Sequence, residues 1–294
     1  MTQIAFLTMD SLDDFVAYDH LVTEELQRHG VAVDEVSWRR TDVSWNDYPL
    51  VVIRSPWDYQ QDPIAFLNVL KQIEAAGAQL QNPLSVCRWN YRKSYLQDLA
   101  AVGIRTIPTV WSDGLSERIL AQAAAQLQSP ELIIKPLIGA NADFTERIPS
   151  LPAASQIREL IAAYAGKSVL IQPFLDHVLD PGEYSLIYFD GNYSHAILKT
   201  PAVGDFRVQE EHGSTITAVT PPAPVLELAQ QTVAALPANL LYARIDVLLL
   251  DDLLPAVIEV ELIEPSLYLS FHGEAPARFC AAICNRLTRG NQGS

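Results

Sequence analysis

The sequence predicts a mixed α/β protein that contains more than one sub-domain. The chain has 294 residues, of which 49% are hydrophobic and 19% charged, so it can bury a sizeable core. Its N-terminal third alternates short apolar runs with helical patterns, which is typical of a parallel sheet with crossover helices. Its C-terminal part contains apolar runs separated by tight turns, which predicts antiparallel hairpins. This length favours two or three sub-domains around a shared cleft.

The N-terminal part begins with three strand-like runs, at 4–8, 31–36 and 50–53. In a parallel sheet the loops at the carboxyl ends of the strands meet the ligand. Arg54 directly follows the third run, in the stretch RSPWDY, and is therefore a candidate for binding an anionic substrate. The alternative is that Arg54 pairs with Asp58 and has only a structural role.

The central part carries two candidate phosphate ligands. A helix is expected from about Asn90 to the stop signal Gly103, followed by a strand. Lys93 in the first turns of this helix would oppose the helix dipole, which slightly favours binding of an anion. Lys135 ends the apolar run ELIIK and precedes the small-residue loop PLIGANADF. Such a loop lets backbone N–H groups approach phosphate oxygens. The alternative for both lysines is an ordinary surface position.

The C-terminal part is expected to be antiparallel. The runs EYSLIYF and YSHAILK are joined by the turn at 190–192, which predicts a hairpin. A polar loop follows, with Lys199, Arg207 and His212. Helices are expected at about 224–236 and 275–287.

A second hairpin is expected in the stretch ARIDVLLLDDLLPAVIEVELIE. If the turn is centred on 252–253, Asp246 lies across from Glu259 and Arg244 lies across from Glu261. Residues two apart share a face, so the three carboxylates point the same way. Like charges directly opposite each other destabilise a ladder. A Mg²⁺ ion, which prefers oxygen ligands, would explain them. The alternative is a solvated face with Glu261 satisfied by Arg244.

Charge and composition exclude some functions. The net charge of −15 argues against nucleic acid or an anionic membrane as a partner, although a small anion needs only a local basic site. No apolar run is long enough to span a bilayer, and the N-terminus is expected to be a strand, not a signal peptide. Cys87, Cys280 and Cys284 lack the spacing of a zinc site, which indicates reduced thiols and a cytoplasmic location.

Taken in order, these motifs resemble the ATP-grasp superfamily of carboxylate–amine ligases, over roughly 50–272. The pattern N-x-x-K with GIRTIPT is similar to the start of its central domain. QPFL is similar to the hinge whose backbone holds adenine, and Glu183 to the carboxylate that binds the ribose hydroxyls. The resemblance implies that ATP is bound by Lys93, Lys135, Gln172, Pro173, Phe174, Leu175 and Glu183, and magnesium by Asp246, Glu259 and Glu261.

Within the superfamily, the chain resembles the glutathione synthetase and ribosomal-protein glutamate ligase group. The Arg-x-Asn and glycine pair of that group are similar to Arg207, Gln209 and Gly213. RSPWDY, AILKTPAVGDF and EVELIEPSLYL are closest to a subset that includes the ligase that closes D-cycloserine from O-ureido-serine. The chain departs from the group at Glu261, where asparagine is usual, and at Ser214, the second position of the glycine pair. EPSLYLSFHG replaces the usual substrate segment, so the substrate stays open.

The resemblance implies an ATP-grasp fold of three sub-domains with ATP between two of them. These are an N-terminal parallel α/β domain (1–88), a central lid domain (89–170) and a C-terminal antiparallel-sheet domain with the metal site (171–294). It also implies an enzyme that uses ATP and two Mg²⁺ ions. A small amino-acid-like carboxylate would become an acyl phosphate, which an amine-type nucleophile attacks.

Several alternatives stay open. The reaction could close a ring, as in D-cycloserine formation from O-ureido-D-serine, or join two amino acids. A regulatory ATP-binding protein without ligase activity is a third option, and a homodimer would be usual for the class. Lys199 would hold adenine or a phosphate. Arg207 would steady the transferring phosphoryl group, unless it pairs with Glu210 or Glu211. The implied catalytic residues are Arg207 and Lys199, and the implied substrate contacts are Arg54, Arg207 and Ser214.

Overall fold

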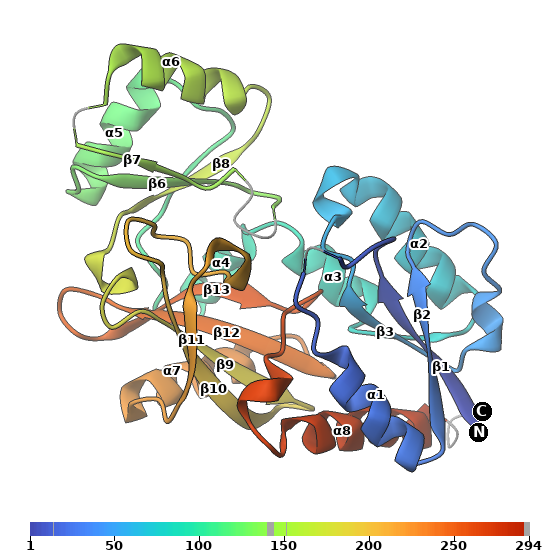
Figure 1. The fold of residues 1–294 in the computed structure, drawn as a ribbon. Coiled ribbons are helices and arrows are strands. Elements are labelled where there is room, and N and C mark those ends of the chain that lie inside the picture. Colours follow the sequence, from blue (N-terminus) through green and yellow to red (C-terminus); the bar gives the residue numbers. More distant parts are fainter. Residues whose placement is uncertain (14, 140–143, 151, 291–294) are drawn as a thin grey trace.

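The computed structural model describes residues 1–13, 15–139, 144–150 and 152–290. Its strands form three separate sheets, each at the centre of one module (Figure 1). The predicted α/β class is therefore confirmed. Ala140, Asn141 and Ala142 of the expected phosphate loop lie outside the described residues. Across the described ranges, the helices are too short or too polar to cross a membrane.

The N-terminal module is a parallel sheet with the strand order β2-β1-β3-β4. Its elements are β1 (Thr2–Thr8), α1 (Asp19–Arg28), β2 (Val31–Ser37), β3 (Leu50–Ser55), α2 (Pro63–Ala75) and β4 (Gln79–Gln81). Alternate residues of a strand point to opposite faces. Phe6 accordingly packs toward α1 and the C-terminal helix α8 (Ala275–Gly290), whereas Leu7 packs with Phe66 of α2. Both faces are covered, which explains why all of β3 is buried.

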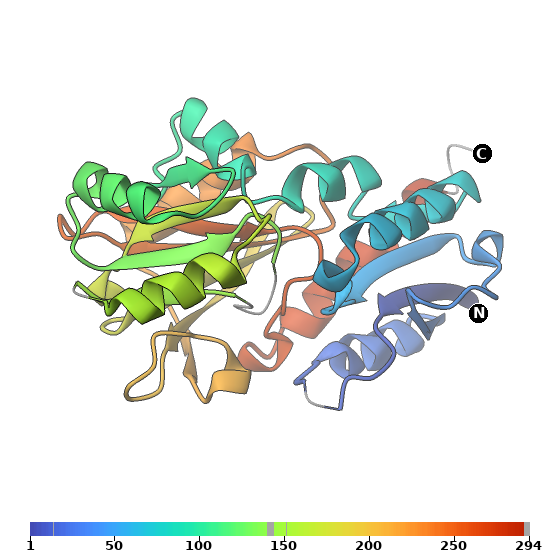
Figure 2. The ribbon, with the colours of Figure 1, turned by 90° about the horizontal axis from the view of Figure 1, so that it is seen from above.

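The central module is a small antiparallel sheet with the order β5-β8-β6-β7. Its elements are β5 (Val110–Ser112), α5 (Glu117–Leu127), β6 (Leu132–Pro136), β7 (Glu146–Ile148), α6 (Ala154–Ala163) and β8 (Val169–Pro173). The two helices cover the outer face of this sheet, and its other face looks toward the C-terminal sheet (Figure 1). Seen from above, the central sheet lies over the C-terminal sheet (Figure 2).

The C-terminal module is a five-stranded antiparallel sheet with the order β11-β10-β9-β12-β13. Its elements are β9 (Glu183–Phe189), β10 (Asn192–Thr200), β11 (Thr215–Val219), α7 (Ala223–Ala235), β12 (Tyr242–Leu249) and β13 (Pro255–Glu261). Two helices, α3 (Leu84–Asn90) and α4 (Tyr95–Ala101), connect the N-terminal and central modules. Single-turn helices occur at Trp45–Asp47, Tyr59–Gln61, Asp176–Val178, Glu210–His212 and Leu269–Phe271.

The register predicted for the second hairpin is confirmed. Asp246 pairs with Glu259 and Arg244 pairs with Glu261. A register shift follows directly, between Asp246 and Val247, so the strands pair differently on the turn side of the carboxylates. The hairpin therefore presents its charged residues together, next to an irregularity in the ladder.

The helix expected from Asn90 is wrong in its boundaries. The chain forms two short helices, and Lys93 lies between them. The Asn90 side chain donates to the Val260 carbonyl at 2.9 Å and accepts from the Leu262 N–H at 3.0 Å. The Lys93 N–H donates to the Leu137 carbonyl at 2.8 Å. These contacts with distant segments replace helical hydrogen bonds. Lys93 therefore lies on the short connection between α3 and α4.

The strand expected after Gly103 is also wrong in extent. This segment makes only a single bridge, between Thr106 and Val257, before β5 begins at Val110. The short strands β4 and β7 and the edge strand β11 were not expected. They have three to five residues or a mostly exposed surface, so they carry little periodic apolar signal.

Asn82 ties the N-terminal module to the C-terminal sheet. Its side chain is fully buried and makes three hydrogen bonds to backbone groups of the C-terminal module. The amide nitrogen donates to the carbonyls of Tyr242 (2.9 Å) and Leu262 (2.7 Å), and the oxygen accepts from the Leu241 N–H (2.7 Å). One side chain thus satisfies polar groups at the ends of both β12 and β13.

Asn82→Ala should lower the free energy of unfolding by about 3 kcal/mol or more, because it leaves three buried backbone groups without partners. The measurement is denaturant unfolding followed by circular dichroism. Asn46→Ala is the control, since Asn46 is exposed and its loss should change the free energy by less than about 0.5 kcal/mol. If Asn82→Ala lowers the free energy of unfolding no more than Asn46→Ala does, the three hydrogen bonds of Asn82 do not stabilise the contact between the modules.

Candidate active site

A cleft lies between the central and C-terminal sheets, and residues of all three modules line it. One part of the lining is apolar and the other is charged. The apolar part includes Ile107, Phe174, Leu175, Val178, Phe206, Val208, Leu248 and Ile258. The charged part includes Lys93, Lys135, Glu183, Lys199, Arg244, Asp246, Glu259, Glu261 and Glu264. Such a lining fits a ligand with a flat apolar group and an anionic tail.

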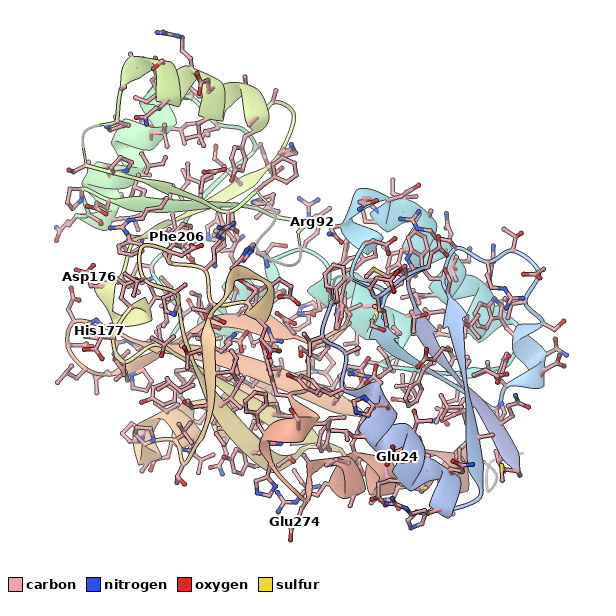
Figure 3. All side chains as sticks on the ribbon, in the orientation of Figure 1. Glu24, Arg92, Asp176, His177, Phe206 and Glu274 are labelled. Atoms are coloured by element: carbon pink, nitrogen blue, oxygen red, sulfur yellow. The ribbon has the colours of Figure 1, made fainter. Side chains whose placement is uncertain are left out.

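The apolar part is built on the end of β8. All four residues of the predicted hinge, Gln172 to Leu175, line the cleft. The Gln172 side chain donates to Thr109 Oγ1 at 3.0 Å, and the Phe174 N–H donates to the Glu131 carbonyl at 2.9 Å. The ring of Phe206 meets Phe174 edge-to-face at 6.3 Å, and Figure 3 shows Phe206 between the central module and the C-terminal sheet. The hinge therefore contacts both the central module and the loop between β10 and β11.

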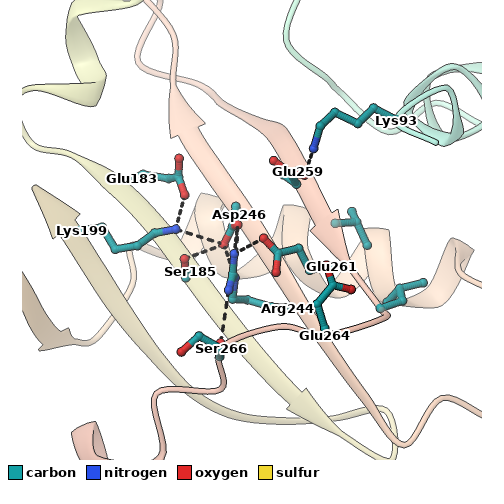
Figure 4. Close-up of polar contacts among 12 residues, drawn as sticks. Lys93, Glu183, Ser185, Lys199, Arg244, Asp246, Glu259, Glu261, Glu264 and Ser266 are labelled. Atoms are coloured by element: carbon teal, nitrogen blue, oxygen red, sulfur yellow. Dashed lines mark hydrogen bonds and ion pairs between the residues drawn. The ribbon is translucent and has the colours of Figure 1, made fainter. Parts of the chain in front are cut away.

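Asp246 is the centre of the charged part. It accepts hydrogen bonds from Arg244 Nε (3.0 Å) and Nη2 (2.9 Å) and from the Ser185 hydroxyl, and Lys199 Nζ lies 3.7 Å away (Figure 4). Arg244 also pairs with Glu261, and its Nη1 donates to the Ser266 carbonyl at 3.2 Å. Lys199 pairs with Glu183. Each of these five charges is thus compensated by an opposite one, as burial of Asp246, Arg244, Lys199 and Glu183 requires.

The pKa values follow from this arrangement. Burial would raise the pKa of Asp246, but Arg244 and Lys199 outweigh it and lower the pKa to about 2. Burial raises the pKa of Glu261 to about 7, because Asp246 and Glu259 add to the burial effect and Arg244 offsets only part of it. Burial would lower the pKa of Lys199, but Asp246 and Glu183 raise it. Arg244 and Lys199 therefore stay charged at neutral pH.

The two lysines predicted to bind phosphate differ in their surroundings. Lys93 pairs with Glu259, and this carboxylate outweighs burial and raises the pKa of Lys93. Lys135 makes no hydrogen bond or ion pair with any residue that the structure describes. Burial, with the nearby charge of Lys93, lowers the pKa of Lys135. Lys135 is thus a cation in the cleft that is open to an anionic ligand.

The three predicted magnesium ligands line the cleft together, and their carboxylate oxygens are the donors that Mg²⁺ prefers. Each is held by a protein cation: Asp246 and Glu261 by Arg244, and Glu259 by Lys93. In the described ranges no three acidic, histidine or cysteine side chains gather closely enough to hold a metal ion as they stand. The donor chemistry fits magnesium, and binding requires these cations to change partners.

Arg54 and Ser214 are not part of the cleft lining. Arg54 is buried, its Nε donates to Asp19 at 2.9 Å, and its guanidinium lies over the rings of Tyr242 and Phe279. Asp58, its expected partner, pairs with Arg39 instead, at 2.8 Å. The Ser214 hydroxyl donates to the Val208 carbonyl at 2.8 Å.

Arg207 lies in the cleft lining, on the loop between β10 and β11. It pairs with Asp205, at 2.8 Å between Nη2 and Oδ2, and not with the expected Glu210 or Glu211. Hydrogen bonds from Arg207 hold the pKa of Asp205 well below its usual range. Glu210 instead accepts a hydrogen bond from the Tyr18 hydroxyl at 2.9 Å, which joins this loop to the N-terminal module.

Several lining residues were not among the predicted site residues. They are Tyr59, Tyr91, Glu210, Glu264 and Tyr268. Glu264, Tyr59 and Tyr268 could have been noticed, because they lie in the motifs RSPWDY and EVELIEPSLYL on which the resemblance rests. Tyr91 and Glu210 carried no such signal, because their place in the cleft depends on how the modules pack.

Comparison with known proteins gives consistent matches. Residues 4–82 match the family model described as the N-terminal domain of D-cycloserine synthetase DcsG. The cycloserine biosynthesis protein DcsG of Streptomyces lavendulae is 30% identical over 302 residues, which cover 97% of this chain and 99% of that protein. The crystal structure of D-cycloserine synthetase DcsG matches with a TM-score of 0.85 at 30% identity, over 97% of this chain and 99% of that one.

More distant structures share the fold. D-alanine–D-alanine ligase from Bacillus anthracis has a TM-score of 0.69 at 15% identity, over 100% of both chains. The ATP-grasp ligase PsnB, solved with a minimal precursor, has a TM-score of 0.65 at 17% identity, over 98% of this chain and 99% of that one. The predicted ATP-grasp fold is therefore confirmed.

Arg244→Met should lower the free energy of unfolding by about 3–5 kcal/mol, because it leaves buried Asp246 and half-buried Glu261 with one cation fewer. The double variant Arg244→Met with Glu261→Gln should recover part of the loss. Thermal and denaturant unfolding measure both.

The control for this prediction is Arg105→Met, which breaks a half-exposed pair with Asp252 and should cost less than about 1 kcal/mol. If Arg244→Met and Arg105→Met lower the free energy of unfolding equally, the ion pairs around Asp246 do not have the stabilising role described above.

Proposed function

The chain belongs to the ATP-grasp ligases, in the family of D-cycloserine synthetase DcsG, and from this premise we propose which reaction its cleft performs. It is an ATP-dependent carboxylate–amine ligase, and we propose that it activates a small amino-acid-like carboxylate as an acyl phosphate. The proposal rests on the cleft lining. Lys135, which has no ion-pair partner among the described residues, and Lys93, which pairs with Glu259, line the same cleft as the apolar part, here called the apolar slot.

ATP would lie along the cleft with its adenine in the apolar slot. The slot lies beside the hinge, whose backbone would hold the edge of the ring, and Phe174 and Leu175 contribute side chains to its wall. Glu183 on β9 would bind the ribose hydroxyls. Lys199 on the neighbouring strand β10 contacts Glu183 and would also face the nucleotide. Lys93 and Lys135 would bind the phosphates, since the hydrogen bonds between an ammonium group and phosphate oxygens are charge-assisted and strong.

Binding of the phosphates would release the carboxylates. When Lys93 turns to a phosphate oxygen, Glu259 loses its partner and becomes free for magnesium. Asp246, Glu259 and Glu261 would hold two Mg²⁺ ions, which supply neutralisation of the charge on the β- and γ-phosphates. Arg244 would offset the charge of Glu261, at the position where the resemblance to the glutathione synthetase group implies an asparagine.

The reaction would take place in two displacements. A carboxylate oxygen of the substrate attacks the γ-phosphorus of ATP, the bond to the β,γ-bridging oxygen breaks, and ADP leaves. A nitrogen nucleophile then attacks the acyl carbon, the C–O bond to the phosphoryl group breaks, phosphate leaves, and the nitrogen gives its proton to solvent. Lysine and arginine side chains supply positioning and positive charge, which is the main demand of phosphoryl transfer.

Arg207 would steady the transferring phosphoryl group. It is 39% exposed and held by Asp205 at the edge of the cleft, so it can turn toward the γ-phosphate with little desolvation. Acyl phosphates hydrolyse in water, so the central module would act as a lid over the reacting groups.

The choice between ring closure and joining two amino acids rests on the relatives. The relative that is 30% identical is described as a cycloserine biosynthesis protein. This favours ring closure of O-ureido-D-serine or a similar compound for this chain. A ligase that joins two amino acids is the second candidate, because the likeness in fold extends to D-alanine–D-alanine ligase.

The first experiment is ADP release with ATP and Mg²⁺, measured against single amino acids, amino-acid pairs and O-ureido-D-serine. Release that depends on one single compound is expected and supports ring closure. Release that needs two amino acids together would favour the second candidate. No release with any compound would contradict the substrate class.

Arg207→Ala should lower kcat by about a hundredfold or more and change the Kd of ATP less than about threefold, because the contact forms with the transferring group. Steady-state kinetics and equilibrium ATP titration separate the two effects. Arg40→Ala is the matched control, since its guanidinium pairs with exposed Asp42 and Arg40 is not among the residues that line the cleft. A variant with weaker ATP binding and normal kcat would show that Arg207 is a nucleotide ligand only.

A further inference from the structure

Glu264 enters the cleft from the segment that follows β13. Its carboxylate lies beside Glu261, on the other side of Asp246 from Lys199 (Figure 4). The Tyr59 hydroxyl hydrogen-bonds to this carboxylate. The backbone at Glu264 is fixed as well, because the indole Nε1 of Trp57 donates to its carbonyl oxygen at 2.8 Å. Two residues of the N-terminal module thus position one carboxylate.

Among the described residues, Glu264 differs from the other carboxylates in the charged part of the cleft in contacting no lysine or arginine. Glu183, Asp246, Glu259 and Glu261 each contact a lysine or arginine. No such contact to Glu264 is present among the residues that the structure describes. Burial raises the pKa of Glu264 well above its ordinary value, the charge of Glu261 adds to the rise, and the charge of Lys93 offsets only part of it. A carboxylate in this position costs free energy in the unliganded protein, and a cationic group of a ligand would remove that cost.

The surroundings of Glu264 favour an ammonium group as that cation. Tyr59, Tyr91 and Tyr268 line the same cleft. Tyr59 belongs to the hydrophobic cluster that contains Ile263, the residue before Glu264, and Tyr91 packs against this cluster. Ring faces attract ammonium groups, whereas a magnesium ion needs several further oxygen ligands. In an amino acid the ammonium group and the carboxylate share one carbon atom. A molecule whose ammonium contacts Glu264 would therefore hold its carboxylate close to Glu261 and Glu259, where the phosphates of ATP are expected.

We propose that Glu264, positioned by Trp57 and Tyr59, binds the ammonium group of the substrate and so selects amino acids over carboxylic acids that lack an amine. The assignment rests on the proposed function, since the carboxylate of the same molecule is the group to be activated. A site that hydrogen-bonds a polar group rejects analogues without that group strongly, because its own polar atoms are left without a partner.

The test is calorimetric titration of two probes into the protein with Mg²⁺ and a non-hydrolysable ATP analogue. One probe is O-ureido-D-serine and the other is 3-(ureidooxy)propanoic acid, which lacks only the amine. If the ADP-release panel selects another amino acid, that compound and its amine-free counterpart are used. Glu264→Gln should weaken binding of the amine-bearing probe about tenfold or more and leave the amine-free probe within about twofold of wild type.

Two further variants make the readout specific. Tyr59→Phe keeps the ring and removes the hydroxyl, and should reduce the preference for the amine by a smaller factor. Glu274→Gln is the matched control, because Glu274 is 71% exposed and lies at the outer end of the molecule (Figure 3), so both affinities should stay unchanged. Glu264→Gln should also keep or raise Tm, since it removes an uncompensated charge, whereas a residue needed only for structure would lower it.

The assignment is overturned if Glu264→Gln binds the amine-bearing probe as wild type does, or if it loses both probes equally. Failure of the proposed function looks different. A wild-type protein that prefers the amine-bearing probe through Glu264 and yet releases no ADP would support this assignment and contradict ligase activity.

Discussion

The burial of Asp246 on β12 is the constraint on which the rest of the cleft depends. A carboxylate that is 2% exposed must be compensated, and Arg244 and Lys199 compensate it. Those two cations in turn bind Glu261 and Glu183. The result is a continuous set of ion pairs across four neighbouring strands, β10, β9, β12 and β13. Removal of one member leaves its partner without compensation, which would cost several kcal/mol.

This arrangement reconciles stability with ligand binding. The unliganded cleft already contains the carboxylates for magnesium and the lysines for phosphate, and most of them neutralise one another. Binding of ATP and Mg²⁺ would exchange the partners of these side chains and would not leave new charges without partners. Lys93 would move from Glu259 to a phosphate, and Mg²⁺ would replace Lys93 beside Glu259. Lys135 and Glu264 are exceptions, because each lacks an oppositely charged partner among the described residues. Lys135 would bind an anionic group of the ligand, and Glu264 would bind a cationic group.

The sequence predicted these features to different extents. The turn expected at 252–253 predicted the register of Asp246 against Glu259, and the structure confirms this pair. Local pattern could not show that Asn90 ends its helix, because its partners Val260 and Leu262 lie about 170 residues away. Arg54 lies near the end of a strand, where a ligand-binding residue is expected. Its burial against the rings of Tyr242 and Phe279 depends on the packing of the distant helix α8, which local sequence does not show. The approach of Tyr59 to Glu264 was hidden for the same reason.

The most direct test of this account is the effect of Mg²⁺ on ATP affinity in Glu259→Gln, compared with wild type and with the surface variant Glu274→Gln. Equilibrium titration with and without Mg²⁺ gives the ratio of the two dissociation constants. The account predicts that Mg²⁺ strengthens ATP binding in wild type and in Glu274→Gln, and that most of this gain disappears in Glu259→Gln while metal-free binding stays the same or improves, because Lys93 is no longer held. An unchanged gain from Mg²⁺ in Glu259→Gln would contradict the role given to this carboxylate and the exchange of partners that depends on it.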